Sequence, residues 1–360
     1  MVVLFIYNLV MGLLRLLLAL SVFLSHIQPF WNINLLNGGV AVDSFFIISG
    51  FYMALILNEK YIGKGAYKLF LTNRFLRIYP TYWIVLLLVV SFTLIKYFFL
   101  HGTGDENVIN SYLHFFANMS PQTAIVGAVN YVSRNITFLL TIDYFYIFTH
   151  EPRSFLVQQS WTLQLELLFY LVAPFFVKRS VFFLVIFIAL AKLVTQFVPF
   201  PYNQTLLVNF TYSLVFFLSG VISYKFYTLL KKRQISRTKL LLIFIGFILI
   251  TFSFDYLSLW IHLSFWFYFF GVGLTIPFIF LLTQRSRLDQ FLGNLSYPFY
   301  ISHLIFIKIL YNTPLKDNNL LFSLTALALS LIVSIAIFLL VEKPIDYYRQ
   351  RRIRKLYNKN

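Results

Sequence analysis

Apolar residues recur along the chain in long runs that only shorter polar or basic segments interrupt. Most of these runs reach about 18 residues, which is enough for a helix to cross the hydrocarbon core of a bilayer. We recognise ten runs, at 8–27, 41–58, 79–100, 161–177, 180–198, 205–227, 239–257, 259–283, 293–311 and 319–341. The pattern predicts an all-α fold, a polytopic membrane helix bundle of about ten transmembrane helices.

The composition supports this class, since 60% of the 360 residues are hydrophobic and only 11% are charged. Soluble domains are about half apolar and about a quarter charged. The chain contains no cysteine, which excludes disulfides, thiol catalysis and thiolate metal sites. We expect no metal centre and no tightly bound cofactor. The N-terminus lacks the basic region and cleavage site of a signal peptide, so the first run is predicted to remain as a helix.

The net charge of +17 is distributed unevenly. Most Lys and Arg residues lie in five segments that alternating spans place on one side of the membrane, at 59–77, 178–179, 225–239, 285–289 and 342–360. Such segments usually face the cytoplasm, so we predict that both termini are cytoplasmic. The excess charge then sets topology and attracts anionic lipid. Nucleic-acid binding is not expected, because no soluble domain carries these residues.

The longest segment between two runs, 101–160, is predicted to lie outside. It contains polar stretches and an aromatic stretch, "ITFLLTIDYFYIF", at 136–148. That stretch is either an eleventh span or a surface-lying or re-entrant segment. We favour the second interpretation, because an eleventh span would place the basic C-terminal tail outside.

Two ionisable residues interrupt the first apolar run, Arg15 and His26. Eleven residues at about 100° each bring both side chains to one helix face, about 16 Å apart. Charge is costly in hydrocarbon, so a shared inward face with a function is one interpretation. The alternative is that Arg15 reaches inner-leaflet phosphates and His26 is an interfacial residue without a task.

The second run carries Asp43 near its outer end and Ser49 within it. The connection to the first run is short, so the Asp43 carboxylate can approach His26, orient the imidazole and raise its basicity. Asp43 is also compatible with a role as helix N-cap. For Ser49 and the adjoining Gly50, we favour close helix packing over direct chemistry.

Arg74 and Arg77 stand three residues apart before the third run, so one side of a helix can present both. Guanidinium forks suit phosphate groups, which favours a cytoplasmic pocket for a phosphorylated ligand. The alternative is an ordinary positive-inside anchor.

Polar residues also occur within the fourth and ninth runs. Glu166 lies about two turns into an apolar helix, so we expect a partner in the protein interior, either Arg15 or a polar substrate group. The ninth run carries Ser296 and Tyr297 at its inner boundary and His303 in its middle. For His303 alone, a packed and hydrogen-bonded core residue is the simpler interpretation. "VEKP", at 341–344, is predicted to end the last span.

Together these segments resemble the membrane acyltransferase-3 family. The resemblance covers about residues 8–345 and follows the order of six family motifs. The matching elements are Arg15-x10-His26, "GGVAVDSFFIISGF" with Ala41 at a common glycine position, "NRFLRIYPTYW" with Asn73 replacing an arginine, "SWTLQLELLFYLVAPFF", "LSYPFYISH" and "VEKP".

The resemblance implies an enzyme that transfers an acyl group, most often acetyl, from cytoplasmic acyl-CoA to a hydroxyl of an extracytoplasmic glycan. It implies His26 as base or acyl carrier, Arg15 in its support, and Asp43 and Glu166 as further site residues. It also implies a donor or substrate site, for which the candidates are Arg74, Arg77, Ser49, Tyr297 and His303. We expect an acyltransferase domain at 1–345, a basic cytoplasmic tail at 346–360, and a place in a bacterial cytoplasmic membrane.

Two questions stay open at this point. His26 either deprotonates the acceptor for direct attack on the thioester or is acylated first. The chain completes transfer itself, which we favour, or hands the acyl group to a separate protein. The alternative function is a non-enzymatic transporter or flippase of a lipid-linked glycan. Such a protein would typically show paired repeats and broken helices, and neither is evident in the sequence. The sequence does not indicate an oligomeric state.

Overall fold

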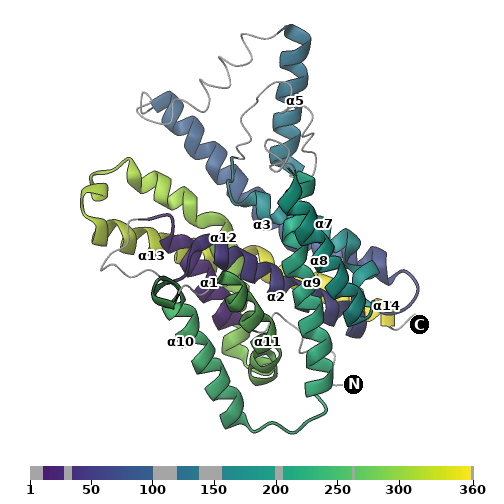
Figure 1. The fold of residues 1–360 in the computed structure, drawn as a ribbon. Helices are drawn as coiled ribbons and strands as arrows, with labels where there is room; N and C mark the ends of the chain where they lie inside the picture. Colours follow the sequence, from purple (N-terminus) through teal and green to yellow (C-terminus); the bar gives the residue numbers. More distant parts are fainter. Residues whose placement is uncertain are drawn as a thin grey trace.

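The computed structural model describes residues 11–27, 35–99, 120–137, 156–198, 206–261 and 264–357. Within these ranges the chain forms helices and no strand (Figure 1). In chain order the helices are α1 (Gly12–Leu24), α2 (Gly38–Glu59), α3 (Ala66–Phe99), α5 (Pro121–Thr137), α7 (Ser160–Val177), α8 (Val181–Phe197), α9 (Leu206–Leu230), α10 (Arg237–Ile261), α11 (Phe265–Thr283), α12 (Arg287–Tyr311), the 3-10 turn η4 (Pro314–Asp317), α13 (Asn319–Ile337), the π-helical turn η5 (Phe338–Glu342) and α14 (Lys343–Tyr357).

The predicted class, an all-helical membrane bundle, is confirmed. Seven of the described helical segments are long and apolar enough to cross a membrane, and α1 and α8 are shorter apolar helices. With α12, they account for each of the ten predicted runs. The number of crossings and the cytoplasmic location of the termini stay predictions.

Helices α1 and α12 run parallel in one constant register. The Gly12 amide donates to the Asp289 carboxylate, and the rings of Phe23 and His26 contact those of Phe299 and His303, respectively. The Asp289 carboxylate fixes this pairing, because it accepts hydrogen bonds from the first backbone amides of α1, Gly12 N at 2.8 Å and Leu13 N at 2.9 Å. An acidic side chain at a helix N-terminus satisfies unpaired donors there and complements the helix dipole.

Helices α2 and α9 pack backbone to backbone through two glycines. A Cβ atom on Gly50 would lie 1.9 Å from the Phe217 carbonyl oxygen, and one on Gly220 would lie 2.0 Å from that of Ile47. Small residues permit such close approach between membrane helices. The predicted close packing therefore involves Gly50. The neighbouring Ser49 side chain faces α7 instead, where it contacts Glu166.

The relative directions of the helices agree with the predicted alternation of spans. Asp43 contacts Tyr212 near the start of α2 and α9, and Glu59 contacts Lys231 near their ends. The two helices are therefore parallel, as the second and sixth spans must be. The α1 and α12 pair is parallel as well, as the first and ninth spans must be. For these four helices the observed directions are those that the predicted order of spans requires.

Segment 101–160 contains a helix that the sequence did not predict, α5, which stands apart from the central helices in Figure 1. Its C-terminal carbonyls accept hydrogen bonds from α3, including one from Trp83 Nε1 to Ile136 O at 3.0 Å and one from the Tyr79 hydroxyl to Thr137 O at 2.5 Å. The aromatic stretch 136–148 lies outside the described residues apart from its first two positions.

The prediction that "VEKP" ends the last helix is wrong. Helix α13 passes through the π turn η5 directly into α14, and the Lys343 amide donates to Phe338 O five residues earlier. Proline lacks an amide hydrogen and displaces the carbonyl one turn before it. The wider π turn accommodates Pro344 without ending the helix. As a result the helix continues as α14, which packs against α3.

Candidate functional site

Three adjoining cavities follow one another through the middle of the bundle. The inner cavity includes Lys60, Arg74, Arg77, Glu342, Asp346 and Arg349. The central cavity includes Arg15, Ser49, Arg74, Arg77, Glu166, Ser296 and Tyr297. The outer cavity includes Ser25, His26, Gly38, Gly39, Gln159 and Trp161. Arg74 and Arg77 line both the inner and the central cavity, and Val42 and Tyr300 line both the central and the outer one.

Most of the predicted site residues converge on this series of cavities. Arg15, Ser49, Arg74, Arg77, Glu166 and Tyr297 meet at the central cavity, although they come from five helices. His26 lines the outer cavity, while Asp43 and His303 are not among the residues that line any of the three. The inward shared face predicted for Arg15 and His26 therefore exists, but the two residues open into different cavities.

Glu166 binds hydroxyl groups rather than Arg15. Ser49 Oγ donates to Glu166 Oε1 at 2.6 Å, and the Tyr170 hydroxyl donates to the same oxygen. Arg15 Nη1 donates to the Gly293 carbonyl at 3.3 Å. No ion pair joins Arg15 to Glu166, both of which lie within the described ranges. The ion pair with Arg15, one of the two alternatives for Glu166, is absent, and both side chains line one cavity.

The two predicted guanidinium groups on α3 lack acidic partners. Arg74 is buried, its Cζ lies 5.8 Å from the ring centroids of both Phe70 and Tyr170, and its Nε has no hydrogen-bond partner. Arg77 makes no hydrogen bond or ion pair within the described part of the chain. Burying a cation such as Arg74 without an ion-pair partner is costly, whereas Arg77 is only half-buried and shares the inner cavity with Glu342. Both side chains line the inner and the central cavity, and the choice between a phosphate-binding pair and a topology anchor stays a prediction.

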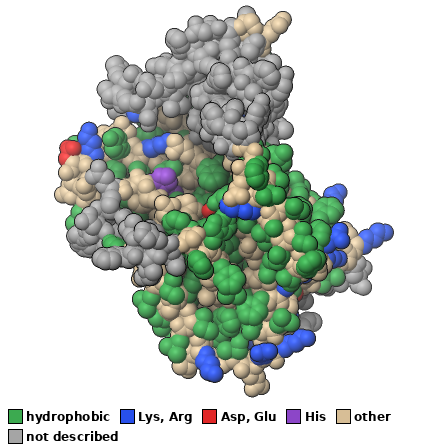
Figure 2. Space-filling model, viewed as in Figure 1, with side chains coloured by type: hydrophobic (Ala, Val, Ile, Leu, Met, Phe, Trp, Pro, Cys, Tyr) green, Lys and Arg blue, Asp and Glu red, His purple; other side chains and the backbone are tan. Residues whose placement is uncertain are grey.

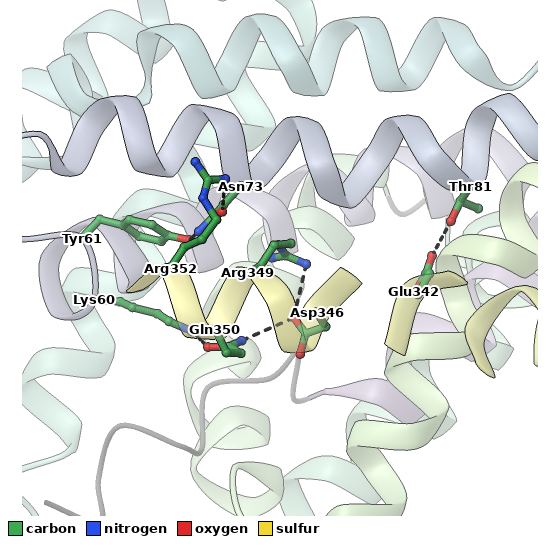
Figure 3. Close-up of polar contacts among 9 residues, drawn as sticks. All are labelled: Lys60, Tyr61, Asn73, Thr81, Glu342, Asp346, Arg349, Gln350 and Arg352. Atoms are coloured by element: carbon green, nitrogen blue, oxygen red, sulfur yellow. Dashed lines mark hydrogen bonds and ion pairs between the residues drawn. The ribbon is translucent and has the colours of Figure 1, made fainter. Parts of the chain in front are cut away.

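The C-terminal helix α14 forms a wall of the inner cavity, which the sequence did not predict (Figure 3). Lys60 Nζ donates to Gln350 Oε1 at 2.9 Å. Arg349, also buried, forms an ion pair with Asp346 at 3.3 Å and keeps an unpartnered Nε. Burial, with smaller contributions from Arg74 and Arg349 that Asp346 opposes, lowers the pKa of Lys60 to about 8. The predicted tail at 346–360 is therefore largely a structured part of the site.

The family resemblance leads us to expect an arginine at position 73, where this chain has Asn73. The Asn73 side chain is hydrogen-bonded to the guanidinium of Arg352 from α14. Arg352 donates to Asn73 Oδ1 at 2.9 Å, and Asn73 Nδ2 donates to the Tyr61 hydroxyl at 3.1 Å (Figure 3). Arg352 also donates to Thr72 Oγ1 at 2.9 Å. Positive charge is thus present beside residue 73 although the side chain itself is neutral. This contact also holds α14 against the start of α3.

His26 lies two residues beyond the end of α1, on a turn where its backbone amide donates to Phe23 O at 3.1 Å. Of the described histidines, His26 is exposed and His303 is buried. A histidine side chain (purple) is visible at the surface of the face that Figure 2 shows. The fully buried His303 lies beneath His26, with ring centroids 5.6 Å apart. His303 Nδ1 lies 3.3 Å from the Phe299 carbonyl oxygen, and the other ring nitrogen, Nε2, is buried without a hydrogen-bond partner.

Asp43 does not take the role that its sequence position suggested. Its Oδ2 accepts a hydrogen bond from the Tyr212 hydroxyl of α9 at 3.2 Å, and no contact joins it to His26. It is also not the N-cap, because α2 begins earlier, at Gly38, and Asn37 Oδ1 caps it by accepting from Gly39 N at 2.9 Å. With α2 extended, Val42 faces the outer cavity and Asp43 turns toward α9.

The structure adds several residues to the site that the sequence analysis left unassigned. Trp161, within the segment "SWTLQLELLFYLVAPFF", and Gln159, directly before it, line the outer cavity. Glu342, within "VEKP", accepts from Thr81 Oγ1 at 3.0 Å and lines the inner cavity. An acidic residue directly after the last apolar run was the available signal for Glu342. Among the described residues, no group of three or more acidic or histidine side chains is arranged to hold a metal ion.

These features define a multi-pass membrane helix bundle with a basic cavity at one end, a histidine at the other and polar side chains between. Residues 8–339 match the acyltransferase-3 family model, whose description is "Acyltransferase domain". The chain therefore belongs to the acyltransferase-3 family.

Similar curated proteins include two from Staphylococcus aureus, strains COL and MSSA476, each named "Putative O-acetyltransferase". Both are 27% identical to the chain over 163 residues, which is 45% of the chain and 23% of each relative. The chain thus matches less than a quarter of the length of these relatives. No solved structure matches the chain.

Proposed function

We propose that the protein is a membrane O-acyltransferase of a bacterial cytoplasmic membrane. It would move an acyl group, in the simplest case acetyl, from cytoplasmic acyl-CoA to a hydroxyl of an extracytoplasmic glycan. Family membership and the names of the relatives support the reaction class. The observation that carries the proposal is the order of the three cavities, from clustered cations to an exposed histidine.

The inner cavity suits the nucleotide end of acyl-CoA. Coenzyme A carries several phosphate charges, and Lys60, Arg74, Arg77 and Arg349 line this cavity beside only two acidic residues. Arginine binds phosphate through two parallel charge-assisted hydrogen bonds. The unpartnered Nε atoms of Arg74 and Arg349 have donor capacity that a phosphate would satisfy. Lys60 would be held protonated by the same anion.

The central cavity suits the pantetheine arm of the donor, which carries amides and the thioester. Arg15, Ser49, Glu166 and Tyr297 surround this space with donors and acceptors. Arg15 shows no contact with His26, so it would support the reaction from the donor side. A guanidinium near the thioester carbonyl would stabilise the negative charge that develops on its oxygen.

His26 suits the acceptor step. In direct transfer, it takes the proton of the acceptor hydroxyl while that oxygen attacks the thioester carbonyl carbon. A C–O bond forms, the C–S bond breaks, and the thiolate of CoA leaves and acquires a proton. In the two-step route, a His26 nitrogen attacks first, CoA leaves, and the acceptor hydroxyl then takes the acyl group from the imidazole. Both routes end with acylated glycan and free CoA.

The test uses the purified full chain in lipid nanodiscs, with acetyl-CoA and surface glycan from a strain that lacks the gene. We expect release of free CoA together with an acetylated glycan that mass spectrometry detects, and loss of both with His26→Ala. A transporter would move glycan across a vesicle membrane without CoA release. Equal transfer by wild type and His26→Ala would contradict the proposed role of His26, and no transfer by either would contradict the enzyme.

A further inference from the structure

We propose that the outer cavity is an acceptor subsite for an uncharged sugar ring, in which Trp161 provides the stacking face and Gln159 binds a ring hydroxyl. This inference rests on the proposed function and specifies the acceptor beside His26. It depends on the side chains of the outer cavity and not on the family resemblance.

Trp161 offers an open aromatic face next to His26. It is the second residue of α7, its side chain is 45% exposed, and it lines the same cavity as His26. Its indole makes no ring contact or hydrogen bond within the described part of the chain. Aromatic faces carry negative charge density and attract the weakly positive C–H groups on one side of a pyranose ring.

Gln159 supplies a buried polar group without a partner. The residue is 5% exposed, it lines the outer cavity, and its side-chain Nε2 has no hydrogen-bond partner. Its backbone carbonyl accepts from Thr162 Oγ1 at 2.8 Å, which fixes the residue at the start of α7. An amide left unsatisfied in a buried place is costly, and a ligand hydroxyl would satisfy it.

The remaining walls carry amides, glycines and apolar groups rather than charges. Among the described residues that line the outer cavity there is no Asp, Glu, Lys or Arg, and His26 is the residue there that could carry a charge. At Gly38, a Cβ atom would lie 2.4 Å from Ser25 Oγ, so α2 begins in direct contact with the turn that carries His26. Few polar groups on a largely apolar wall are typical of small-ligand sites. A charged sugar would lose hydration here without gaining a counter-charge.

The competing interpretation of Trp161 is an interfacial anchor, since tryptophan is enriched at membrane surfaces. The chain offers a matched control in Trp266. It is likewise the second residue of its helix, α11, and is 41% exposed, but it stacks on Phe216 and lies outside the outer cavity. An anchor role predicts similar effects at both positions, whereas a sugar platform predicts an effect at Trp161 alone.

The experiment measures binding and transfer with the full chain in nanodiscs. The probes are neutral heptasaccharides of glucose, galactose and mannose, and a heptagalacturonate as the anionic counterpart. Variants are Trp161→Leu, Trp161→Phe, Gln159→Leu and Trp266→Leu. With the best neutral probe, we expect Trp161→Leu and Gln159→Leu to raise the acceptor KM about tenfold or more, with kcat and acetyl-CoA KM within twofold. Trp161→Phe should retain most of the affinity, and Trp266→Leu should match wild type.

The outcomes separate this inference from the proposed function. Neutral-sugar binding that depends on Trp161 without any acetyl transfer would leave the subsite intact and overturn the enzyme. Acetyl transfer with an unchanged acceptor KM in Trp161→Leu and Gln159→Leu would overturn the subsite and leave the enzyme intact. Equal effects at Trp161 and Trp266, tighter binding of the galacturonate, or no binding of any neutral probe would each overturn the inference as well.

Discussion

The imidazole rings of His26 and His303 lie one above the other, with centroids 5.6 Å apart and planes inclined by 33°. His26 lies on the turn that follows α1 and His303 lies on α12, and the Asp289 cap holds these two helices in parallel register. In the neutral tautomer in which His303 Nδ1 donates to the Phe299 carbonyl, Nε2 is an acceptor. A buried acceptor without a partner thus lies beneath the proposed catalytic base.

We predict that His303 positions His26, directly or through a water molecule. His303→Phe should lower kcat by about 10-fold to 100-fold, which is less than the roughly 100-fold to 10,000-fold that a general acid or base itself contributes, because His303 acts through His26; the acyl-CoA KM should change little. His303→Gln, whose amide oxygen can accept the same hydrogen bond, should recover part of that loss. A merely structural role would predict that Phe, a good core residue, is tolerated at least as well as Gln, and the two thermal midpoints report on folding separately.

Arg74 and Arg77 are predicted to bind the phosphates of the donor. The Arg74→Ala, Arg77→Ala double variant should raise the acyl-CoA KM at least about 100-fold, because each charge-assisted contact contributes roughly 1.5–3 kcal/mol. Arg285→Ala, which removes an exposed cation from another predicted cytoplasmic segment, serves as the control and should bind donor like wild type. Equal donor affinity in the double variant and wild type would return this pair to the role of a topology anchor.

The buried Lys60 is predicted to lower the stability of the folded protein and to strengthen the binding of acyl-CoA. Burial lowers its pKa from 10.5 to about 8, a difference equivalent to about 3 kcal/mol at most. The folded state therefore binds fewer protons than the unfolded chain between pH 8 and 10.5, so this cost is complete below pH 8 and disappears as the pH rises toward 10.5.

Lys60→Met should accordingly raise the thermal midpoint at pH 7 and lose this advantage near pH 10.5, while weakening acyl-CoA binding. In wild type, donor KM should rise as the pH increases through about 8, because the anion prefers the ammonium form. A variant that binds donor normally at pH 7, or a stability gain that grows with pH, contradicts this account of Lys60.

The α2–α9 contact gives a prediction about stability alone. Gly220→Ala places a Cβ atom 2.0 Å from Ile47 O and 2.6 Å from Phe51 N, so the helices must separate. We expect a loss of about 1–3 kcal/mol, typical of overpacking. The control is Gly246→Ala on α10, where a Cβ atom meets nothing within 4 Å; it should be neutral or stabilising by about 1 kcal/mol. Similar thermal midpoints for the two variants would show that α2 and α9 are not held at this distance.

Periodicity in the sequence was sufficient to predict the bundle and to place Arg15 and His26 on an inward face. It could not predict His303 as the neighbour of His26, because the register between two helices 277 residues apart depends on tertiary contacts such as the Asp289 cap. The same limit applies to Glu166, whose hydroxyl partner, Ser49, comes from α2.

Local signals were misleading at two helix ends. The apolar run suggested that α2 begins near Asp43, but the polar turn from Asn37 through the glycine pair is already helical, and this rotates Asp43 away from His26. Pro344 suggested a helix end, although a π turn carries the chain on into α14. Both errors concern backbone geometry that residue preferences do not determine, and the second concealed one wall of the inner cavity.

The central claim is that donor and acceptor reach one path from opposite sides, with His26 at the acceptor end. The most direct measurement uses sealed proteoliposomes of one verified orientation, with acetyl-CoA on the side of the inner cavity and glycan on the side of His26. We predict that acetylated glycan accumulates only on the His26 side, with free CoA on the other, and that His26→Ala abolishes both. Transfer that requires both substrates on one side, or that proceeds unchanged in His26→Ala, would contradict the account.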